Sequence, residues 1–369
     1  MSGTPPQRTV HVVLPGDIDD PSRPSGGNRY DRRLCQGLAA VGWSVPELPI
    51  AGGWPRPDTT ELQALERALA AVPDGGLVLL DGLVACAAPE VVVPQATRLR
   101  LVVLVHLPLA DETGLGVTEA ARLHARERRT LQAACAVVAT SAWAGRRLVD
   151  RHGLPADRVH VVAPGVDPAP LAPGTDGATR LLCVASVTPR KGHDLLIRAL
   201  ATMTELPWRC DCVGGLGQAD EFVARVRTLL AEHGLADRIR LLGPRTGAEL
   251  AASYAAADLL VLPSRAETYG MVVTEALAHG IPVLATDVDG VPEALGRAPD
   301  GTLPGVLVPP EDPAALAEAL RRWLTEPGTR DRLRAAARAR RDTLHGWEVT
   351  SRSMTDLLER LDREAAATG

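Results

Sequence analysis

The chain has 369 residues, of which 46% are hydrophobic and 3% aromatic, and its formal net charge is −5. This length is typical of two domains rather than of one compact core. A mildly acidic chain does not indicate a nucleic-acid partner, and so few aromatic side chains do not form a stacking platform for single strands.

The N-terminus and the cysteines both indicate a cytoplasmic protein. Residues Met1–Gln7 are polar and lack the basic flank, apolar stretch and cleavage site of a signal peptide. No run approaches the roughly 20 apolar residues that cross a bilayer.

The six cysteines lie scattered in apolar segments, and only Cys210 and Cys212 are close, on one face of a predicted strand. We therefore interpret all of them as buried reduced thiols rather than as a metal or redox site.

Short apolar runs alternate with longer amphipathic runs through the first half of the chain, which is typical of parallel α/β architecture. A helix is predicted over Asn28–Ala40. Pro164–Gly177 contains four prolines and three glycines and predicts a linker, because that density interrupts helices and sheets alike. The strands predicted before the linker are Thr9–Leu14, Leu77–Leu80, Leu101–Val105, Ala136–Ala139 and Val159–Val162.

A second alternating series follows the linker, and three helical segments end the chain. Its predicted strands are Arg180–Val184, Arg209–Val213, Ile239–Leu242, Leu259–Leu262, Val283–Ala285 and Val306–Val308, and the final helices are Pro313–Thr325, Thr329–Leu344 and Trp347–Ala366. Two such series predict two Rossmann-like, doubly wound domains at residues 1–165 and 166–345, followed by a terminal helical segment at 346–369. Their ligands are expected at the carboxyl ends of the strands, in a cleft between the domains.

Two glutamates follow the strand predicted at Leu259–Leu262. Glu267 lies in the loop after that strand, and Glu275 lies about one turn into the next helix. The backbone amides from Thr268 to Met271 precede or open this helix, so they form a natural site for oxygens or anions. One carboxylate can bind a sugar hydroxyl while the other reaches a second diol, such as a ribose. Taken alone, a capping acid and a solvated helix acid would explain the same two residues.

Cations and glycines precede helices in two further strand–loop–helix units. Lys191 is expected at a helix N-terminus after a strand, where a cation and the helix dipole together bind a diphosphate. The alternative is that Arg190 and Lys191 form an exposed basic turn. In the first unit of the chain, Gly26 and Gly27 allow the backbone to approach a phosphate closely.

Taken together, these pieces resemble the retaining glycosyltransferases of the GT-B fold, in the large fourth family that includes sucrose and trehalose synthases and bacterial mannosyltransferases. The resemblance covers nearly the whole chain. The matching pieces, in chain order, are the Gly26-Gly27 loop, His106 after a strand, Ala163-Pro164-Gly165-Val166-Asp167, Arg190-Lys191-Gly192, and the pair Glu267 and Glu275.

The resemblance implies transfer of a hexosyl group from a UDP- or GDP-sugar to a small-molecule, lipid or glycan acceptor, with retention and without a cofactor or metal. It implies that His106, Lys191 and Glu267 are the catalytic residues and that Glu275 binds the ribose. His106 is alternatively an ordinary strand-end histidine. Ser186 replaces an arginine that is usual in the family, and we expect Arg190 to supply that charge. The resemblance also implies that the final helix crosses back to the first domain. The other donor-binding residues implied are Gly26, Gly27, Arg190, Arg245, Thr268, Tyr269, Gly270 and Met271.

Some signals indicate other functions. The pairs Asp17/Asp19 and Asp287/Asp289 have a metal-binding spacing, but Lys191 and the helix ends can hold the diphosphate, so we expect no metal. The basic segment Arg122–Arg129 is interpreted as a solvated surface rather than a membrane-docking helix, because Glu127 interrupts it. A nucleotide-sugar epimerase or hydrolase and a non-catalytic sugar-nucleotide-binding protein stay open as alternatives.

Overall fold

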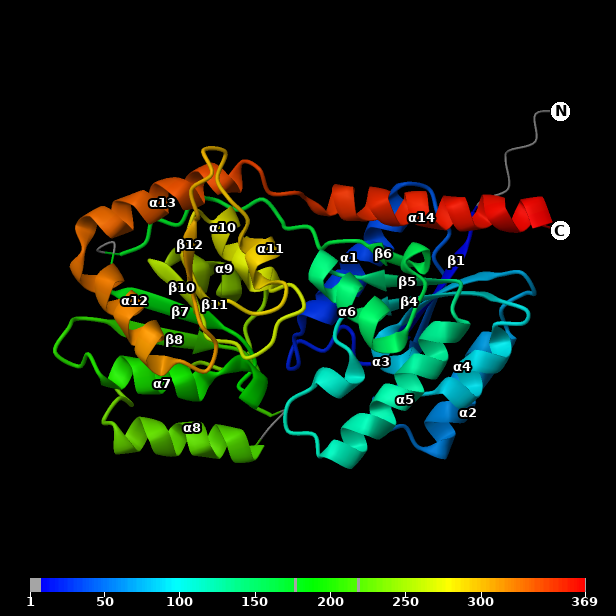
Figure 1. Ribbon diagram of the computed structural model, residues 1–369, viewed down its shortest axis with the longest axis horizontal. Helices are drawn as coiled ribbons and strands as arrows, with labels where there is room; N and C mark the ends of the chain where they lie inside the picture. The colour runs from blue at the N-terminus through cyan, green and yellow to red at the C-terminus, as the bar shows by residue number, and fades with distance from the viewer. Residues whose placement is uncertain (1–7, 176–177, 218–219, 369) are drawn as a thin grey trace. The chain divides into compact units, whose positions relative to one another are not determined.

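The computed structural model describes residues 8–175, 178–217 and 220–368 (Figure 1). The chain divides into two compact units, the first comprising residues 1–19, 25–165 and 347–369 and the second comprising residues 20–24 and 166–346. Within the described ranges, each unit holds one six-stranded sheet, and all the strand pairs are parallel. The predicted pair of doubly wound α/β domains is confirmed.

The first unit alternates strands and helices up to residue 165 and then includes the last helix of the chain. Its strands are β1 (Val10–Pro15), β2 (Glu47–Ile50), β3 (Leu77–Asp81), β4 (Arg100–Val105), β5 (Ala136–Ala139) and β6 (Val159–Val161). Its helices are α1 (Gly26–Ala40), α2 (Thr59–Ala70), α3 (Gly82–Ala85), α4 (Pro89–Gln95), α5 (Val117–Ala133), α6 (Ala142–His152) and α14 (Trp347–Thr368), with 3₁₀ turns η1 (Leu109–Asp111) and η2 (Ala156–Arg158).

The strand order of the first sheet is β2-β1-β3-β4-β5-β6. The chain therefore runs outward from β1 to β2 and returns to the other side of β1 as β3. Ligands of open α/β sheets bind at the carboxyl ends of the strands where the order reverses in this way. One face of the sheet is covered by apolar side chains of α2 and α5, with Leu65 and Leu131 in the same core as Val78, Leu80 and Val103.

The second unit follows the linker, of which residues 164–175 form neither helix nor strand and Asp176 and Gly177 lie outside the described residues. Its strands are β7 (Arg180–Val184), β8 (Arg209–Val213), β9 (Ile239–Leu241), β10 (Leu259–Leu262), β11 (Val283–Thr286) and β12 (Gly305–Val308). Its helices are α7 (His193–Ala201), α8 (Asp220–Glu232), α9 (Gly247–Ala255), α10 (Met271–Ala278), α11 (Val291–Leu295), α12 (Pro313–Thr325) and α13 (Pro327–Arg341), with the 3₁₀ turn η3 (Pro189–Lys191).

The second sheet repeats the same design, with the order β12-β11-β10-β7-β8-β9, so that its reversal lies between β7 and β10. Alternate residues of β7 enter different cores. Leu181 packs with residues of α7, α8 and α12, whereas Leu182 packs with residues of α9, α10 and α11. A parallel sheet covered on both faces requires nearly continuous apolar strands, which explains why these runs were recognisable in the sequence.

Helix α14 lies beside α1 within the first unit (Figure 1). The ring of Trp347, at the start of α14, meets the ring of Tyr30 edge-on at 5.8 Å. The Tyr30 hydroxyl donates to the carbonyl oxygen of Val162 at 2.9 Å. The two helices approach closely at Gly37 and Ser351, where a Cβ atom added to Gly37 would lie 1.8 Å from Ser351 Oγ.

Strand β2 (Glu47–Ile50), an edge strand that contains Pro49, is not among the strands predicted from the sequence. Proline is found in sheets mainly at edges, so its presence obscured the strand pattern. Helix α13 begins at Pro327 and ends at Arg341, whereas the prediction placed it at Thr329–Leu344. Among the described residues, none of the helices combines the length and the apolar character that a membrane span requires.

The close approach of α1 and α14 can be tested by Gly37→Ala. The added methyl group would overlap Ser351, so we expect the free energy of unfolding to fall by about 1–3 kcal/mol. Ser351→Gly removes the overlapping atoms, and the double variant should lose less stability than the sum of the two single variants. Gly328→Ala on α13 is the matched control, because nothing lies within 4 Å of its added Cβ. Additive losses, measured in thermal unfolding, would contradict this packing.

Candidate functional site

In the first unit, three polar side chains meet where the strand order reverses. Asp81 is the last residue of β3, His106 directly follows β4, and Asp31 lies on α1, the helix after β1. His106 Nε2 is 2.7 Å from Asp31 Oδ1 and 3.7 Å from Asp81 Oδ2. Asp81 also caps α3, because its Oδ1 accepts the Leu83 amide at 2.6 Å. The strand ends thus hold an imidazole beside two carboxyl groups.

The charges of this cluster depend on one another. Burial, together with the negative charge of Asp31, raises the pKa of Asp81 to about 8, although His106 opposes the shift. Burial alone would lower the pKa of His106, but the charges of Asp31 and Asp81 outweigh it, so the pKa is raised. At neutral pH, Asp81 is therefore largely protonated, and Asp31 supplies most of the effect that makes His106 more readily charged than a free histidine.

The same three residues have the atom types of a metal site, but their spacing is that of a hydrogen-bonded group. Two nitrogen or oxygen ligands on one metal ion, each bonded at about 2.0–2.2 Å, lie about 3 Å or more apart. The 2.7 Å between His106 and Asp31 is a hydrogen-bond distance.

The predicted residues Gly27 and His106 lie together in the first unit. Helix α1 begins at Gly26, and Ser25 caps it by accepting the Asn28 amide at 3.0 Å. A Cβ atom at Gly27 would lie 3.1 Å from His106 Cδ2. The absence of a side chain at Gly27 therefore leaves room for the imidazole beside the first turn of α1.

In the second unit, Lys191 and Glu267 are in direct contact, with Lys191 Nζ bonded to Glu267 Oε1. Lys191 ends the 3₁₀ turn after β7, and Glu267 lies in the loop after β10, so both follow the strands between which the order reverses. Gly192 allows this arrangement. Its φ is +68°, and a Cβ atom there would lie 2.0 Å from the carbonyl oxygen of Pro263.

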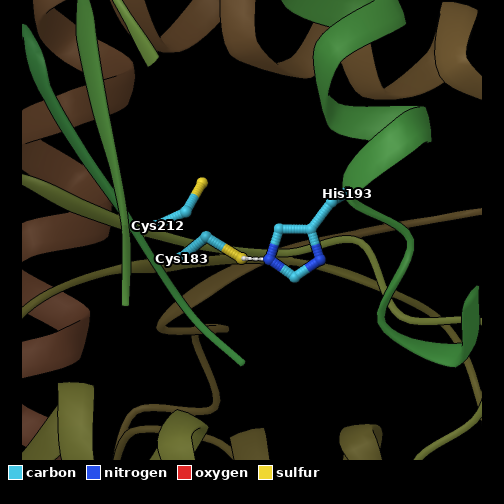
Figure 2. Close-up of side chains that lie close together, drawn as sticks. All are labelled: Cys183, His193 and Cys212. Atoms are coloured by element: carbon cyan, nitrogen blue, oxygen red, sulfur yellow. Dashed lines mark hydrogen bonds between the residues drawn. The ribbon is translucent and has the colours of Figure 1, made fainter. Parts of the chain in front are cut away.

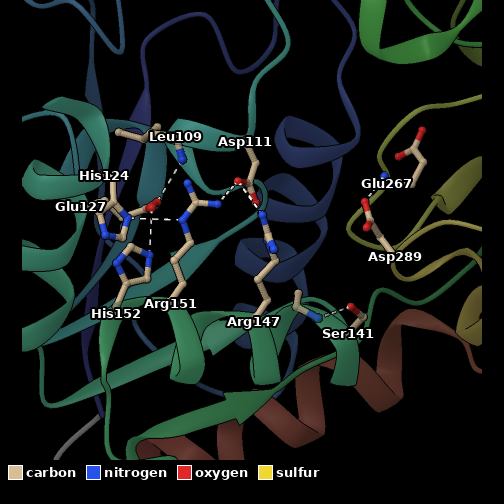
Figure 3. Close-up of polar contacts among 11 residues, drawn as sticks. Leu109, Asp111, His124, Glu127, Ser141, Arg147, Arg151, His152, Glu267 and Asp289 are labelled. Atoms are coloured by element: carbon tan, nitrogen blue, oxygen red, sulfur yellow. Dashed lines mark hydrogen bonds and ion pairs between the residues drawn. The ribbon is translucent and has the colours of Figure 1, made fainter. Parts of the chain in front are cut away.

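Four further residues hold the Glu267 loop in place. Ser264 Oγ donates to Glu267 Oε1 at 3.0 Å. The Glu267 amide donates to Asp289 Oδ2 at 2.9 Å (Figure 3), and the Glu267 carbonyl accepts the Gly290 amide at 2.9 Å. Arg190 NH1 donates to the carbonyl oxygen of Ala266 at 3.3 Å and lies 3.9 Å from Glu267 Oε2. Glu267 is thus held through both its backbone and its side chain.

The electrostatics of this pair favour one more anion. Burial would raise the pKa of Glu267, but the charges of Lys191 and Arg190 outweigh it and lower the pKa. The pKa of Lys191 is lowered by burial, with a contribution from Arg190, although Glu267 opposes the shift. One carboxylate therefore does not fully compensate the buried ammonium group, and a further negative group beside Lys191 would stabilise its charged form.

The N-terminus of helix α10 follows Glu267 closely in the chain. Its N-cap residue, Gly270, has a φ of +91° and provides no side-chain cap. The first amides of α10 are consequently able to bind oxygens of a ligand. Glu275 lies on the same helix, and its Oε2 accepts a hydrogen bond from the Tyr254 hydroxyl at 2.7 Å.

Arg245 is not brought to the Lys191–Glu267 pair by any contact that the structure describes. Its NH1 donates to Ser253 Oγ of α9 at 3.0 Å. Its expected place near the nucleotide base stays a prediction, as do the ligand-binding roles of the other residues.

Four residues of the two clusters are not among the predicted site residues: Asp31, Asp81, Ser264 and Tyr254. Asp81 had a detectable signal, because it is a carboxylate at the end of an apolar run and is followed by Gly82. Asp289 was considered only as part of a metal-binding pair, whereas it supports the Glu267 loop. A further signal marks Lys191, which is the only lysine of the sequence.

The expectation that Glu127 interrupts a solvated helix face was wrong. Glu127 is 1% exposed, its Oε1 accepts the Leu109 amide at 3.1 Å, and its Oε2 lies 3.1 Å from His152 Nε2 (Figure 3). Beside it, Asp111 binds both Arg147 and Arg151. Glu127 thus has a structural role, because its contacts hold the segment after β4 against α5 and α6.

Comparisons with known proteins identify the family of the chain. The family described as "Glycosyltransferase Family 4" matches residues 24–170, and "Glycosyl transferases group 1" matches residues 174–340. The chain belongs to the family-4 glycosyltransferases of the GT-B fold. The family covers both units, and each candidate cluster lies within a matched segment.

Among curated relatives, the D-inositol 3-phosphate glycosyltransferase of Kineococcus radiotolerans is 34% identical over 268 residues, covering 65% of this chain and 60% of that protein. The enzyme of the same name from Streptosporangium roseum is 35% identical over 249 residues, covering 63% of this chain and 56% of that protein. The chain thus matches about three fifths of the length of these relatives.

Two solved structures share the fold. Sucrose-phosphate synthase from Thermosynechococcus elongatus superposes with a TM-score of 0.78 at 22% identity, covering 97% of this chain and 100% of that chain. Anabaena Alr3699/HepE in complex with UDP-glucose superposes with a TM-score of 0.74 at 18% identity, covering 95% of this chain and 99% of that chain.

The protonated state of Asp81 predicts a pH dependence of stability. Between its unfolded pKa near 4 and its folded pKa of about 8, the folded protein holds a proton that the unfolded chain has lost, so the free energy of unfolding falls as pH rises. Asp81→Asn preserves the oxygen that caps α3 and should flatten this fall in denaturant titrations across the window. Asp74→Asn, at an exposed ion pair with Arg98, is the control and should leave the slope unchanged. An equal slope in Asp81→Asn and the unmodified protein would contradict the assignment.

Proposed function

We propose that this protein transfers a hexosyl group from a UDP- or GDP-sugar to a small-molecule, lipid or glycan acceptor, with retention of configuration and without a metal at the reacting centre. The observation that carries the proposal is the contact between Lys191 and Glu267 at the strand reversal of the second unit. Membership of a glycosyltransferase family, with curated relatives named as glycosyltransferases, supports transfer over epimerisation, hydrolysis or binding alone.

Each group of the second unit has a role in holding the donor. Lys191 binds the diphosphate, because its buried ammonium group is favoured by an additional anion. The uncapped amides at the start of α10 bind further oxygens of the donor. Glu267 accepts hydrogen bonds from the sugar hydroxyls, and Glu275, oriented by Tyr254, accepts them from the ribose.

The transfer step requires stabilisation of a leaving group rather than an enzyme nucleophile. The bond from the anomeric carbon to the diphosphate oxygen breaks, and a bond to the acceptor oxygen forms on the same face of the sugar. The acceptor proton moves to the departing phosphate oxygen. Lys191 and the amides of α10 stabilise the negative charge that develops on the diphosphate. In the first unit, Asp31 fixes the ring of His106, which we assign to the reacting sugar.

The first testable consequence concerns the donor class. Nucleoside diphosphates should raise the melting temperature with the concentration dependence of a bound ligand, and the corresponding nucleosides should not. A panel of labelled UDP- and GDP-sugars, with D-inositol 3-phosphate among the acceptors because the curated relatives carry its name, should then yield a labelled product and free nucleoside diphosphate. Sugar release that is independent of every acceptor would favour a hydrolase. Binding without any release would favour a non-catalytic protein.

The second consequence concerns Lys191. Lys191→Ala should lower turnover by about 10²-fold or more, because it removes a charge that opposes the developing negative charge. Lys191→Arg should recover part of the loss, since it restores the charge without the compact shape of an ammonium group. Arg321→Ala is the control, because it removes an exposed cation paired with Glu205 in the same unit. Unchanged turnover in a folded Lys191→Ala variant would remove Lys191 from the mechanism.

A further inference from the structure

Two cysteines and a histidine converge in the core of the second unit, outside the donor-binding groups. Cys183 on β7 and Cys212 on β8 are paired across adjacent strands, and His193 is the first residue of α7. Their two sulfur atoms and one ring nitrogen all lie within 4.8 Å of one another. Cys183 Sγ points at His193 Nε2 at a distance of 3.8 Å (Figure 2).

The three side chains are almost completely removed from solvent, with exposed fractions of 0% for Cys183, 3% for Cys212 and 1% for His193. His193 Nδ1 has no hydrogen-bond partner among the described residues. Nε2 contacts the thiol of Cys183, and a thiol is a weak hydrogen-bonding group. Burial removes the hydrogen bonds that the His193 ring would make with water, and its protein contacts replace them only poorly.

This set of ligand atoms matches the preferences of a thiophilic cation. Zinc binds thiolate sulfur at about 2.3 Å and imidazole nitrogen at about 2.0–2.1 Å, which places its ligand atoms about 3.5–4 Å apart. The 3.8 Å between Cys183 and His193 lies within that range. Cys210 lies on β8 in the same core but is not one of the three converging groups.

Charge balance favours a dication over a monocation. Cys183 and Cys212 are both free cysteines, so each brings a thiol that can lose its proton to a bound metal. Binding of a dication would release one proton from each thiol, and the two thiolates would then cancel its charge. A neutral assembly has a far smaller desolvation cost in an apolar core than an unbalanced ion.

We propose that Cys183, Cys212 and His193 form a buried structural site for a thiophilic dication, with Zn²⁺ as its occupant. The site joins β7, β8 and the start of α7, and His193 is two residues after Lys191. The cation therefore stabilises the segment that carries Lys191 without contacting the reacting atoms. The proposal goes beyond the expectation that every cysteine is a buried reduced thiol, which holds for five of the six. The sixth, Cys135, is only half-buried.

The test measures metal content and not transfer. Full-length protein from zinc-supplemented cells should contain one zinc per chain by elemental analysis, and protein from cobalt-supplemented cells should show thiolate-to-cobalt charge-transfer absorption. Cys183→Ala, Cys212→Ala and His193→Gln should each lose most of the metal and the absorption. Cys86→Ala, a control at an equally buried cysteine of the first unit, should keep both.

Folding is monitored separately, by circular dichroism and by the melting temperature. Zinc-loaded protein should melt at a higher temperature than the folded ligand variants, as expected for a ligand that binds the native state. Less than a tenth of an equivalent of zinc in the unmodified protein, copper in place of zinc, or an equal loss of metal in Cys86→Ala and Cys212→Ala would overturn the proposal. Because no readout uses a sugar donor, such a failure leaves the proposed transferase function standing.

Discussion

The contact between Lys191 and Glu267 is the constraint on which the candidate donor site depends. It brings together the loops that follow β7 and β10, which are neighbours in the sheet but about 75 residues apart along the chain. Gly192 makes the close approach of the two loops feasible, and Asp289 fixes the backbone of Glu267 from a third loop. If these two loops moved apart, the ammonium group of Lys191 would separate from the carboxylate of Glu267.

The chemistry at this position is distinctive because Lys191 is the only lysine of the sequence, in which lysine and arginine together number 40. Elsewhere the chain uses the planar fork of arginine, as where Arg265 binds both oxygens of Asp194. An ammonium group is a compact point charge on a flexible stem, and its pKa responds readily to burial. These properties suit a cation that pairs with Glu267 in one state and with a phosphate in another.

Much of the fold followed from local sequence patterns. The strands at Ala136–Ala139 and Leu259–Leu262 matched their predicted bounds, because each is a short apolar run bounded by polar or turn residues. Lys191 and Glu267 were also identifiable, since each stands at a strand-to-helix transition. Asp31 was not, because only the packing of α1 against β1 brings it to His106, which lies 75 residues later. Likewise, the burial of Glu127 depends on its contact with His152, and the pattern of α5 alone does not reveal it.

The single lysine also allows the central claim to be tested directly, by nuclear magnetic resonance of protein labelled with ¹⁵N at the lysine side chain. One Nζ signal is expected, and it requires no assignment because Lys191 is its only source. The account predicts that saturation with UDP or GDP shifts this signal and raises the pKa of Lys191, whereas the parent nucleosides do not. A signal unchanged by bound nucleoside diphosphate would contradict the account, because Lys191 would then not contact the diphosphate.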